Sequence, residues 1–157
     1  MAASTPALAA LQRAGVDFTT HSYELIESDR SYGEAVAATL QVDPARLFKT
    51  LVAECDLEPV VAIVPVRSQL SLKALARTAK CKRAQMANPV DAERWTGYVV
   101  GGISPFAQKR RMTAFLDESA LGFPTIYVSA GLRGLQVELA PADLIRILEC
   151  RLAALAD

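Results

Sequence analysis

Two apolar runs separated by a three-residue break restrict the fold of this chain more than any other feature. The runs cover residues 47–55 and 59–66, and the break, residues 56–58, carries two carboxylates. Each run has the length and the composition of a strand, and so short a break brings two strands together in antiparallel order. We therefore expect a β-hairpin.

Lys49 lies inside the first run, in the sequence Leu-Phe-Lys-Thr-Leu-Val-Ala. Burying an ammonium group without a partner is costly, so a lysine at such a place is a candidate for a functional site. Periodicity alone also permits a structural interpretation, in which the side chain extends to water from an edge strand. The pattern leaves both interpretations open.

Helix-start and helix-stop residues mark five further segments. A Ser31-Tyr32-Gly33-Glu34 sequence matches a capping box, and Gly15 and Gly97 are expected stops. The expected helices are 6–14 after Thr5, 32–40 after Ser31, 72–79 after Ser71, 89–95 after Asn88, and one after Pro141 with Leu144, Ile147, Leu148, Leu152 and Leu155 on one face.

Short strand-like segments fill the remainder of the chain. Besides the hairpin they cover residues 16–23, 82–86, 98–100, 114–117, 125–129 and 135–139. Strands interleaved irregularly with helices predict an α+β fold rather than a regular βαβ repeat. We expect a single compact domain over residues 1–157, with a mixed β-sheet or barrel of about six or seven short strands and surrounding helices.

Composition excludes several classes of protein. The 157 residues are 52% hydrophobic, enough for one core, and 17 basic residues balance 17 acidic ones, which argues against a strongly electrostatic nucleic-acid binder. Two basic groups, residues 73–83 and 109–111, are either phosphate contacts or solvated surfaces. Without a membrane-length apolar stretch or a secretory signal, we expect a cytoplasmic protein that does not contact membranes.

The titratable residues exclude the common hydrolytic chemistries. His21 is the one histidine and has no nucleophile motif near it, which makes a catalytic triad improbable. Cys55, Cys81 and Cys150 lack metal-ligand or disulfide spacing, so they are expected to be small buried hydrophobes. We expect neither a metal nor another cofactor.

Two glycine-containing loops can bring backbone amides close to a ligand. One is residues 96–105, with Gly101, Gly102 and a trailing Ser-Pro, and the other is residues 129–134, with Ser129 and Gly131. Such amides suit a carbonyl or phosphate oxygen. Each loop is explained equally well as a turn between strands.

Taken in order, these segments resemble the YbaK/EbsC aminoacyl-tRNA editing family, and within it the free-standing bacterial Cys-tRNA(Pro) deacylases. The resemblance rests on Phe-Lys-Thr-Leu at 48–51, Thr-Gly-Tyr-Val-Val-Gly-Gly-Ile-Ser-Pro at 96–105 with Gln-Lys at 108–109, and Thr-Ile-Tyr-Val-Ser at 125–129 with Gly131 and Arg133-Gly134. It spans nearly the whole chain and makes a functional Lys49 the favoured interpretation.

The resemblance implies a metal-free enzyme that acts in trans on mischarged tRNA. It implies a small pocket in which Lys49 is the key catalytic residue, with substrate-binding positions at Tyr23, Thr50, Gly101, Gly102, Ser129 and Gly131. In the cysteine-specific branch the substrate sulfur attacks its own carbonyl, so the pocket supplies proximity and stabilises the oxyanion. The implied partners are the acceptor end of mischarged tRNA and prolyl-tRNA synthetase.

Two positions depart from the family pattern. Gln136 replaces a usual carboxylate and Ala130 a common glycine, and an amide supplies no countercharge to a substrate amino group. Cys-tRNA(Pro) is the expected substrate, and tRNA charged with Ala, Ser or Thr is the alternative within the same family. A non-catalytic module that binds the tRNA end or the synthetase, and a small-ligand protein unrelated to RNA, are the alternatives from other classes.

Overall fold

The computed structural model describes residues 4–24 and 32–157. Five α-helices and eight strands are present in this part of the chain, more strands than the six or seven expected. The elements are α1 (Pro6–Ala14), β1 (Phe18–Ser22), α2 (Tyr32–Leu40), η1 (Pro44–Arg46), β2 (Phe48–Cys55), β3 (Glu58–Pro65), α3 (Leu72–Ala79), β4 (Ala84–Met86), α4 (Pro89–Thr96), β5 (Thr113–Asp117), η2 (Glu118–Gly122), β6 (Ile126–Leu132), β7 (Leu135–Leu139), α5 (Pro141–Leu148) and β8 (Arg151–Ala153).

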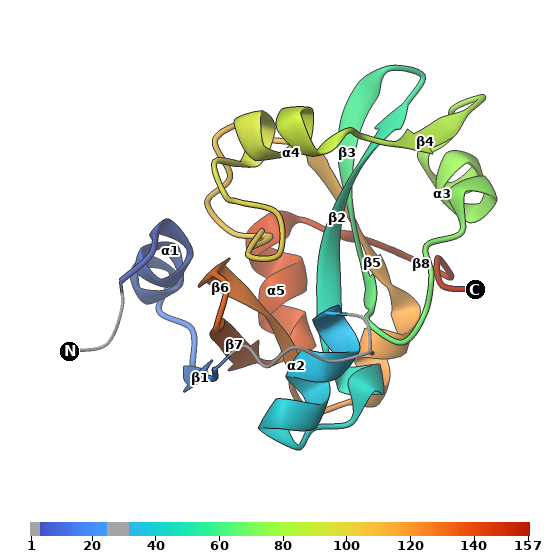
Figure 1. Ribbon diagram of the computed structural model, residues 1–157. Helices are drawn as coiled ribbons and strands as arrows, with labels where there is room; N and C mark the ends of the chain where they lie inside the picture. Colours follow the sequence, from blue (N-terminus) through green and yellow to red (C-terminus); the bar gives the residue numbers. More distant parts are fainter. Residues whose placement is uncertain (1–3, 25–31) are drawn as a thin grey trace.

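The strands form two sheets, and Figure 1 shows α1 and α2 lying at the small sheet's end of the molecule and α3 beside the large one. The small sheet has the order β1-β7-β6 and is antiparallel; the large one has the order β4-β2-β3-β5-β8 and is mixed. The α+β class and the mixed sheet are thus confirmed. The barrel is wrong, because the described strands leave both sheets open at their outer edges.

The predicted hairpin is confirmed as β2 and β3, paired antiparallel from Phe48 with Pro65 to Cys55 with Glu58. Its two-residue turn places Asp56 and Leu57 at φ values of 50° and 72°. Positive φ at both central residues matches the right-handed twist of the two strands, which explains why such a tight turn closes the hairpin.

The predicted helix caps also occur where they can be observed. The side chains of Thr5, Ser71 and Asn88 accept hydrogen bonds from the amides of residues 8, 74 and 91, which otherwise lack helical partners. Gly15 and Gly97 end α1 and α4 in the left-handed conformation. The capping box that begins at Ser31 lies outside the described residues, although α2 itself covers Tyr32–Leu40 as expected.

Three apolar clusters hold the layers together. The largest joins α1, α5, the small sheet and one face of the large sheet, with Phe106, Leu116 and Leu144 fully buried. A second cluster lies under α3 on the opposite face of the large sheet, and a third joins α2 to Leu47 and Tyr127. The large sheet is therefore buried on both faces, which is why the hairpin strands are nearly continuous apolar runs.

Two predicted elements are wrong. Residues 98–100 form no strand but part of a loop, in which the Tyr98 hydroxyl donates to the Phe106 carbonyl at 2.6 Å. The last helix ends at Leu148, where Glu149 takes a φ of 53°, and the chain continues as β8 parallel to β5. Leu152, expected on the apolar helix face, is 41% exposed.

Candidate functional site

A cavity of about 480 Å³ opens beside the first half of β2. Strand β4 pairs only with the last three residues of β2, and β6 meets the start of that edge only through the isolated bridge between Tyr127 and Leu47, so the edge between them is open. The small sheet, α2, α4 and the loop after α4 complete the wall. The lining residues are Tyr32, Gly33, Val36, Leu47, Phe48, Lys49, Thr50, Leu51, Val52, Val66, Met86, Ala87, Pro89, Ala92, Val100, Gly101, Ile103, Ser129, Arg133 and Gln136.

Lys49 lines this cavity and is half-buried. Burial lowers the pKa of its ammonium group below the usual 10.5, and the negative charge of Glu34 on α2 partly offsets that effect. A cation on a mostly apolar wall interacts strongly with an incoming anion or a developing oxyanion, because little water screens it. The side chain of Lys49 therefore contacts the cavity, and its catalytic role stays a prediction.

Two other lining side chains present polar atoms that the protein does not satisfy. Thr50 is 9% exposed and Gln136 is 5% exposed. Within residues 4–24 and 32–157, neither Thr50 Oγ1 nor Gln136 Oε1 has a hydrogen-bond partner. Leaving a buried polar atom unpaired costs about 1–3 kcal/mol, so a hydrogen-bonding group would stabilise either oxygen, although both have almost no surface accessible from the cavity.

A chain of hydrogen bonds fixes the orientation of Gln136. Its Nε2 donates to the Tyr23 hydroxyl at 3.3 Å, and that hydroxyl is 3.1 Å from the hydroxyl of Tyr32. Burial and the contact with Tyr23 raise the pKa of Tyr32, which keeps its hydroxyl protonated. Tyr23, predicted to bind substrate, is not on the cavity wall but positions two residues that are.

The predicted glycine and serine positions divide into wall residues and supporting residues. Gly101 and Ser129 line the cavity. Gly102 lies behind the wall, where a Cβ would be 2.9 Å from the backbone nitrogen of Arg133. Gly131 has a φ of 103°, and a Cβ there would lie 2.8 Å from the ring of Tyr98. The latter two glycines allow the loops to approach each other.

Arg133 and Tyr32 are wall residues that were not among the predicted substrate-binding positions. Both come from segments whose sequence patterns indicated other roles, a turn after β6 for Arg133 and a helix start for Tyr32. The alternation along β7 was the one usable signal for a further wall residue, Gln136. It indicates this residue because the hairpin of β6 and β7 places Gln136 opposite Ser129. That signal requires the strand register, which the sequence does not supply.

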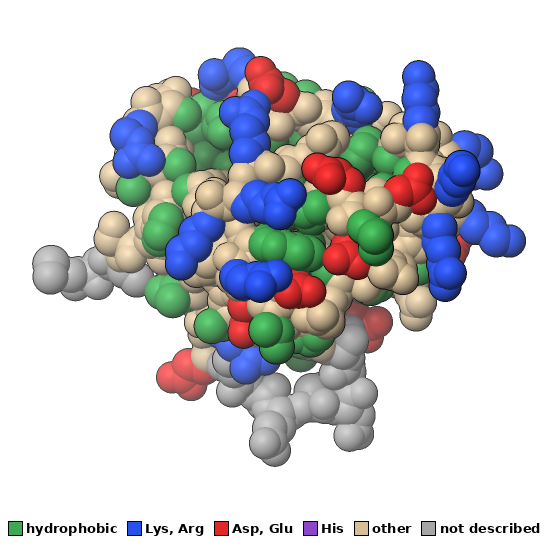
Figure 2. Space-filling view, turned by 90° about the horizontal axis from the view of Figure 1, so that it is seen from above, with side chains coloured by type: hydrophobic (Ala, Val, Ile, Leu, Met, Phe, Trp, Pro, Cys, Tyr) green, Lys and Arg blue, Asp and Glu red, His purple; other side chains and the backbone are tan. Residues whose placement is uncertain are grey.

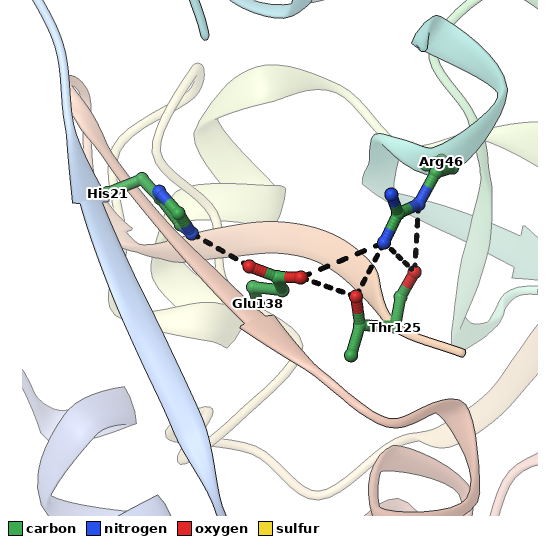
Figure 3. A network of polar contacts seen from close by, with 4 residues as sticks. All are labelled: His21, Arg46, Thr125 and Glu138. Carbon is green, nitrogen blue, oxygen red and sulfur yellow. Dashed lines mark hydrogen bonds and ion pairs between the residues drawn. The ribbon is translucent and has the colours of Figure 1, made fainter. Parts of the chain in front are cut away.

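A second polar cluster lies on the same face of β7, two residues after Gln136. Glu138 Oε1 is 3.0 Å from His21 Nε2, and its Oε2 accepts from Thr125 Oγ1 at 2.5 Å (Figure 3). Arg46 donates to the carbonyl and the hydroxyl of Thr125 and lies 3.7 Å from Glu138. Although burial opposes it, the hydrogen bonds from Thr125 and His21 hold the pKa of Glu138 below its usual range.

Charge is dispersed on one face of the molecule. Figure 2, which views the molecule from above relative to Figure 1, shows Lys and Arg side chains spread among acidic and hydrophobic ones rather than gathered in one patch. No group of three or more His, Cys, Asp and Glu side chains in the described part could hold a metal ion. None of the described helices is both long and apolar enough to cross a membrane.

The three cysteines carry no disulfide. Cys55 is buried as expected, whereas Cys81 and Cys150 are only partly so. Burial raises the pKa of Cys55, aided by Cys81 nearby, and the pKa of Cys150, each to about 12. Thiols with raised pKa values are poor nucleophiles, so Cys55 and Cys150 indicate no catalytic site.

Comparison with known proteins identifies similar chains. The family described as the aminoacyl-tRNA editing domain matches residues 27–147. The "Putative Cys-tRNA(Pro)/Cys-tRNA(Cys) deacylase EbsC" of Enterococcus faecalis is 40% identical over 120 residues, which cover 76% of this chain and 73% of that protein. The "Multifunctional Ser/Thr-tRNA deacylase ProXp-y" of Escherichia coli K12 is 27% identical over 89% of this chain and 84% of its own.

A solved structure supports the fold assignment. The "putative trans-editing enzyme for prolyl tRNA synthetase" has a TM-score of 0.83 to this structure and is 22% identical, covering 99% of both chains. At that identity the match establishes the shared fold.

Proposed function

Because this chain belongs to the aminoacyl-tRNA editing domain family, we propose that it hydrolyses mischarged aminoacyl-tRNA in trans, with Cys-tRNA(Pro) as its main substrate. The observation that carries the proposal is the small cavity beside β2, whose mostly apolar wall includes the half-buried ammonium group of Lys49. A volume of about 480 Å³ suits an amino acid and part of the terminal ribose.

Lys49 is assigned an electrostatic role. Its ammonium group stabilises negative charge on the ester carbonyl oxygen as the tetrahedral intermediate forms, and its burial strengthens that interaction. Thr50, Gly101 and Ser129 hold the aminoacyl group against it. Tyr23, Gly102 and Gly131 contribute by fixing the wall from behind.

For a cysteinyl ester, the nucleophile comes from the substrate. Its sulfur attacks the ester carbonyl to give a cyclic thioester, the bond to the ribose oxygen breaks, and that oxygen takes up the proton lost by the thiol. Water then opens the thioester. The pocket contributes proximity and charge stabilisation, which fits a wall that presents no serine–histidine or cysteine–histidine pair among its lining residues.

One observation favours a second substrate class. Thr50 Oγ1 and Gln136 Oε1 can pair with a substrate hydroxyl, so Ser- or Thr-charged tRNA is the alternative, as in the ProXp-y relative. A site that pairs with a hydroxyl discriminates strongly against analogues lacking one.

The extent of the domain, the cellular location and the protein partner are also part of the proposal. Residues 1–157 act as one editing domain, since α1 packs on β6 and β8 pairs with β5 at the opposite edge of the fold. The protein works in the cytoplasm, where tRNA is charged. Prolyl-tRNA synthetase delivers the tRNA locally, which compensates for the zero net charge of this chain.

The test is deacylation of Cys-, Ala-, Ser-, Thr- and Pro-charged tRNA(Pro) by wild type and Lys49→Ala. We expect the fastest turnover on Cys-tRNA(Pro) and a loss of about 100-fold in kcat/KM for Lys49→Ala. Lys73→Ala, which removes an exposed lysine on α3, is the matched control and should retain full activity.

Three outcomes would overturn parts of the proposal. Equal rates for wild type and Lys49→Ala remove Lys49 from the mechanism. Preference for Ser- or Thr-tRNA replaces the main substrate by the alternative. Tight binding of charged tRNA without cleavage of any ester makes the protein a non-catalytic binding module.

A further inference from the structure

Arg133 occupies the mouth of the cavity. It lies in the turn between β6 and β7, its side chain is exposed, and it is nevertheless a lining residue. Lys49, in contrast, is half-buried within the strand β2. The cavity therefore has one cation on its inner wall and another at its opening.

Two neighbours hold the Arg133 guanidinium in place. Its Cζ is 5.1 Å from the centre of the Tyr32 ring, a cation–π arrangement. On the other loop, a Cβ at Gly101 would overlap Nε and would lie 3.0 Å from Nη2, so the guanidinium packs directly over the Cα of this glycine. An arginine in such a position has already lost much of its side-chain freedom before it binds anything.

The donors of this guanidinium remain available. The ion pairs of the described residues involve Arg46, Arg94, Arg110, Arg111 and Arg146 but not Arg133. No described side chain or carbonyl accepts a hydrogen bond from it either. A fixed, planar fork with free donors matches the geometry of a phosphate, to which arginine binds through two parallel hydrogen bonds.

We propose that Arg133, held between Tyr32 and Gly101, binds the phosphate of the 3′-terminal nucleotide of tRNA. The inference rests on the proposed function, since it requires the aminoacyl group to occupy the cavity interior. The terminal nucleotide is then the next part of the substrate outside the cavity, where Arg133 lies. This contact recognises tRNA as a polyanion and is independent of the amino acid.

Two substrates separate this role from a structural one. A charged tRNA carries the phosphate, whereas a 2′(3′)-O-aminoacyl adenosine offers the same ester without it. For Arg133→Ala we expect kcat/KM on charged tRNA to fall about tenfold, mainly through KM, and the rate on aminoacyl adenosine to stay within about twofold of wild type.

Salt dependence and conservative variants sharpen the result. Losing one phosphate contact to a single-stranded end should reduce the slope of log KM against log salt by about 0.7. Arg133→Lys keeps the charge but not the fork, so it should recover only part of the loss. Arg77→Ala, an exposed arginine on α3, controls for a general change of charge.

A binding measurement keeps the inference independent of turnover. Wild type should bind AMP more tightly than adenosine, and Arg133→Ala should bind the two equally. If no ester is cleaved but this difference appears, the proposed function fails and the phosphate contact stands. If Arg133→Ala slows both substrates equally, or leaves AMP preference and tRNA KM unchanged, the inference is wrong.

Discussion

Two polar clusters lie two residues apart on the same face of β7, and they differ in one respect. Around Glu138 both carboxylate oxygens accept hydrogen bonds from other protein residues. Around Gln136 one oxygen is bonded to nothing in the described chain, as is Thr50 Oγ1 across the cavity. The partly exposed Glu138 thus belongs to a self-contained polar cluster, whereas the more deeply buried Gln136 belongs to an incomplete one.

The comparison predicts that the two clusters respond oppositely to loss of polarity. Glu138→Gln keeps the size of the side chain but removes the charge that His21 and Thr125 contact. We expect the free energy of unfolding to fall by about 2 kcal/mol, because hydrogen bonds to a charged group are the stronger kind. Chemical denaturation measures this loss, and deacylation at 25 °C should change less than about twofold.

The matched control is Glu149→Gln, whose partner Arg111 is 83% exposed, and it should leave stability unchanged. The pH dependence gives a second check. The pKa of Glu138 is lower in the folded protein than its usual value of about 4.5. The carboxylate therefore stabilises the protein fully at pH values above about 4.5, and this contribution is lost as the pH falls through the folded pKa. The stability gap between wild type and Glu138→Gln should therefore be constant near neutrality and shrink below about pH 4.5. If the difference in stability between wild type and Glu138→Gln persists below about pH 4.5, the cluster does not stabilise the protein through the charge of Glu138.

At the cavity, Thr50→Val removes an unpaired hydroxyl and keeps the shape. We expect kcat/KM to fall about tenfold, equivalent to about 1.4 kcal/mol, while the free energy of unfolding stays equal or rises by up to about 1 kcal/mol. Thr39→Val, at an exposed helix position where the hydroxyl bonds to the Ala35 carbonyl, is the control for activity. A destabilised Thr50→Val with normal activity would make this hydroxyl structural and erase the contrast with Glu138.

The smallest effect on stability is expected at Lys49. Burial lowers the pKa of Lys49, so the folded state disfavours its charged form. The resulting loss of stability is complete at pH values below the folded pKa, and it vanishes as the pH rises toward 10.5. Lys49→Met should therefore be more stable than wild type at pH 7, by less than about 1 kcal/mol because the group is partly solvated, and the difference should shrink in alkaline denaturation experiments. A less stable Lys49→Met would place Lys49 in a favourable structural ion pair.

Local rules predicted most of the fold, and long-range pairing accounts for what they missed. The β2–β3 hairpin, the helix caps and β7 follow from neighbouring residues. The sequence pattern extended α5 to Leu155 because its apolar spacing continues, but Glu149 ends the helix and Asp117 binds the following segment. Asp117 accepts from the amides of Leu155 and Ala156 at 2.8 and 3.0 Å, a contact between residues 38 and 39 positions apart.

The site was predictable to a similar depth. Lys49, Thr50, Gly101 and Ser129 line one cavity, as the family resemblance implies. The contacts of the Glu138 cluster and the position of Arg133 at the cavity could not be predicted, because each depends on which strands pair and in what register. His21 and Glu138 are 117 positions apart, and no local pattern connects them.

The arrangement of the small sheet also constrains how the protein can be made. Strand β1 pairs only with β7, and the Thr5 hydroxyl bonds to the Ala130 carbonyl 125 positions later. During synthesis the first helix and strand must therefore wait, with their apolar faces uncovered, until most of the chain has left the ribosome. Formation of this sheet is consequently a late folding event, and the interval before it is when the nascent chain is most exposed to aggregation.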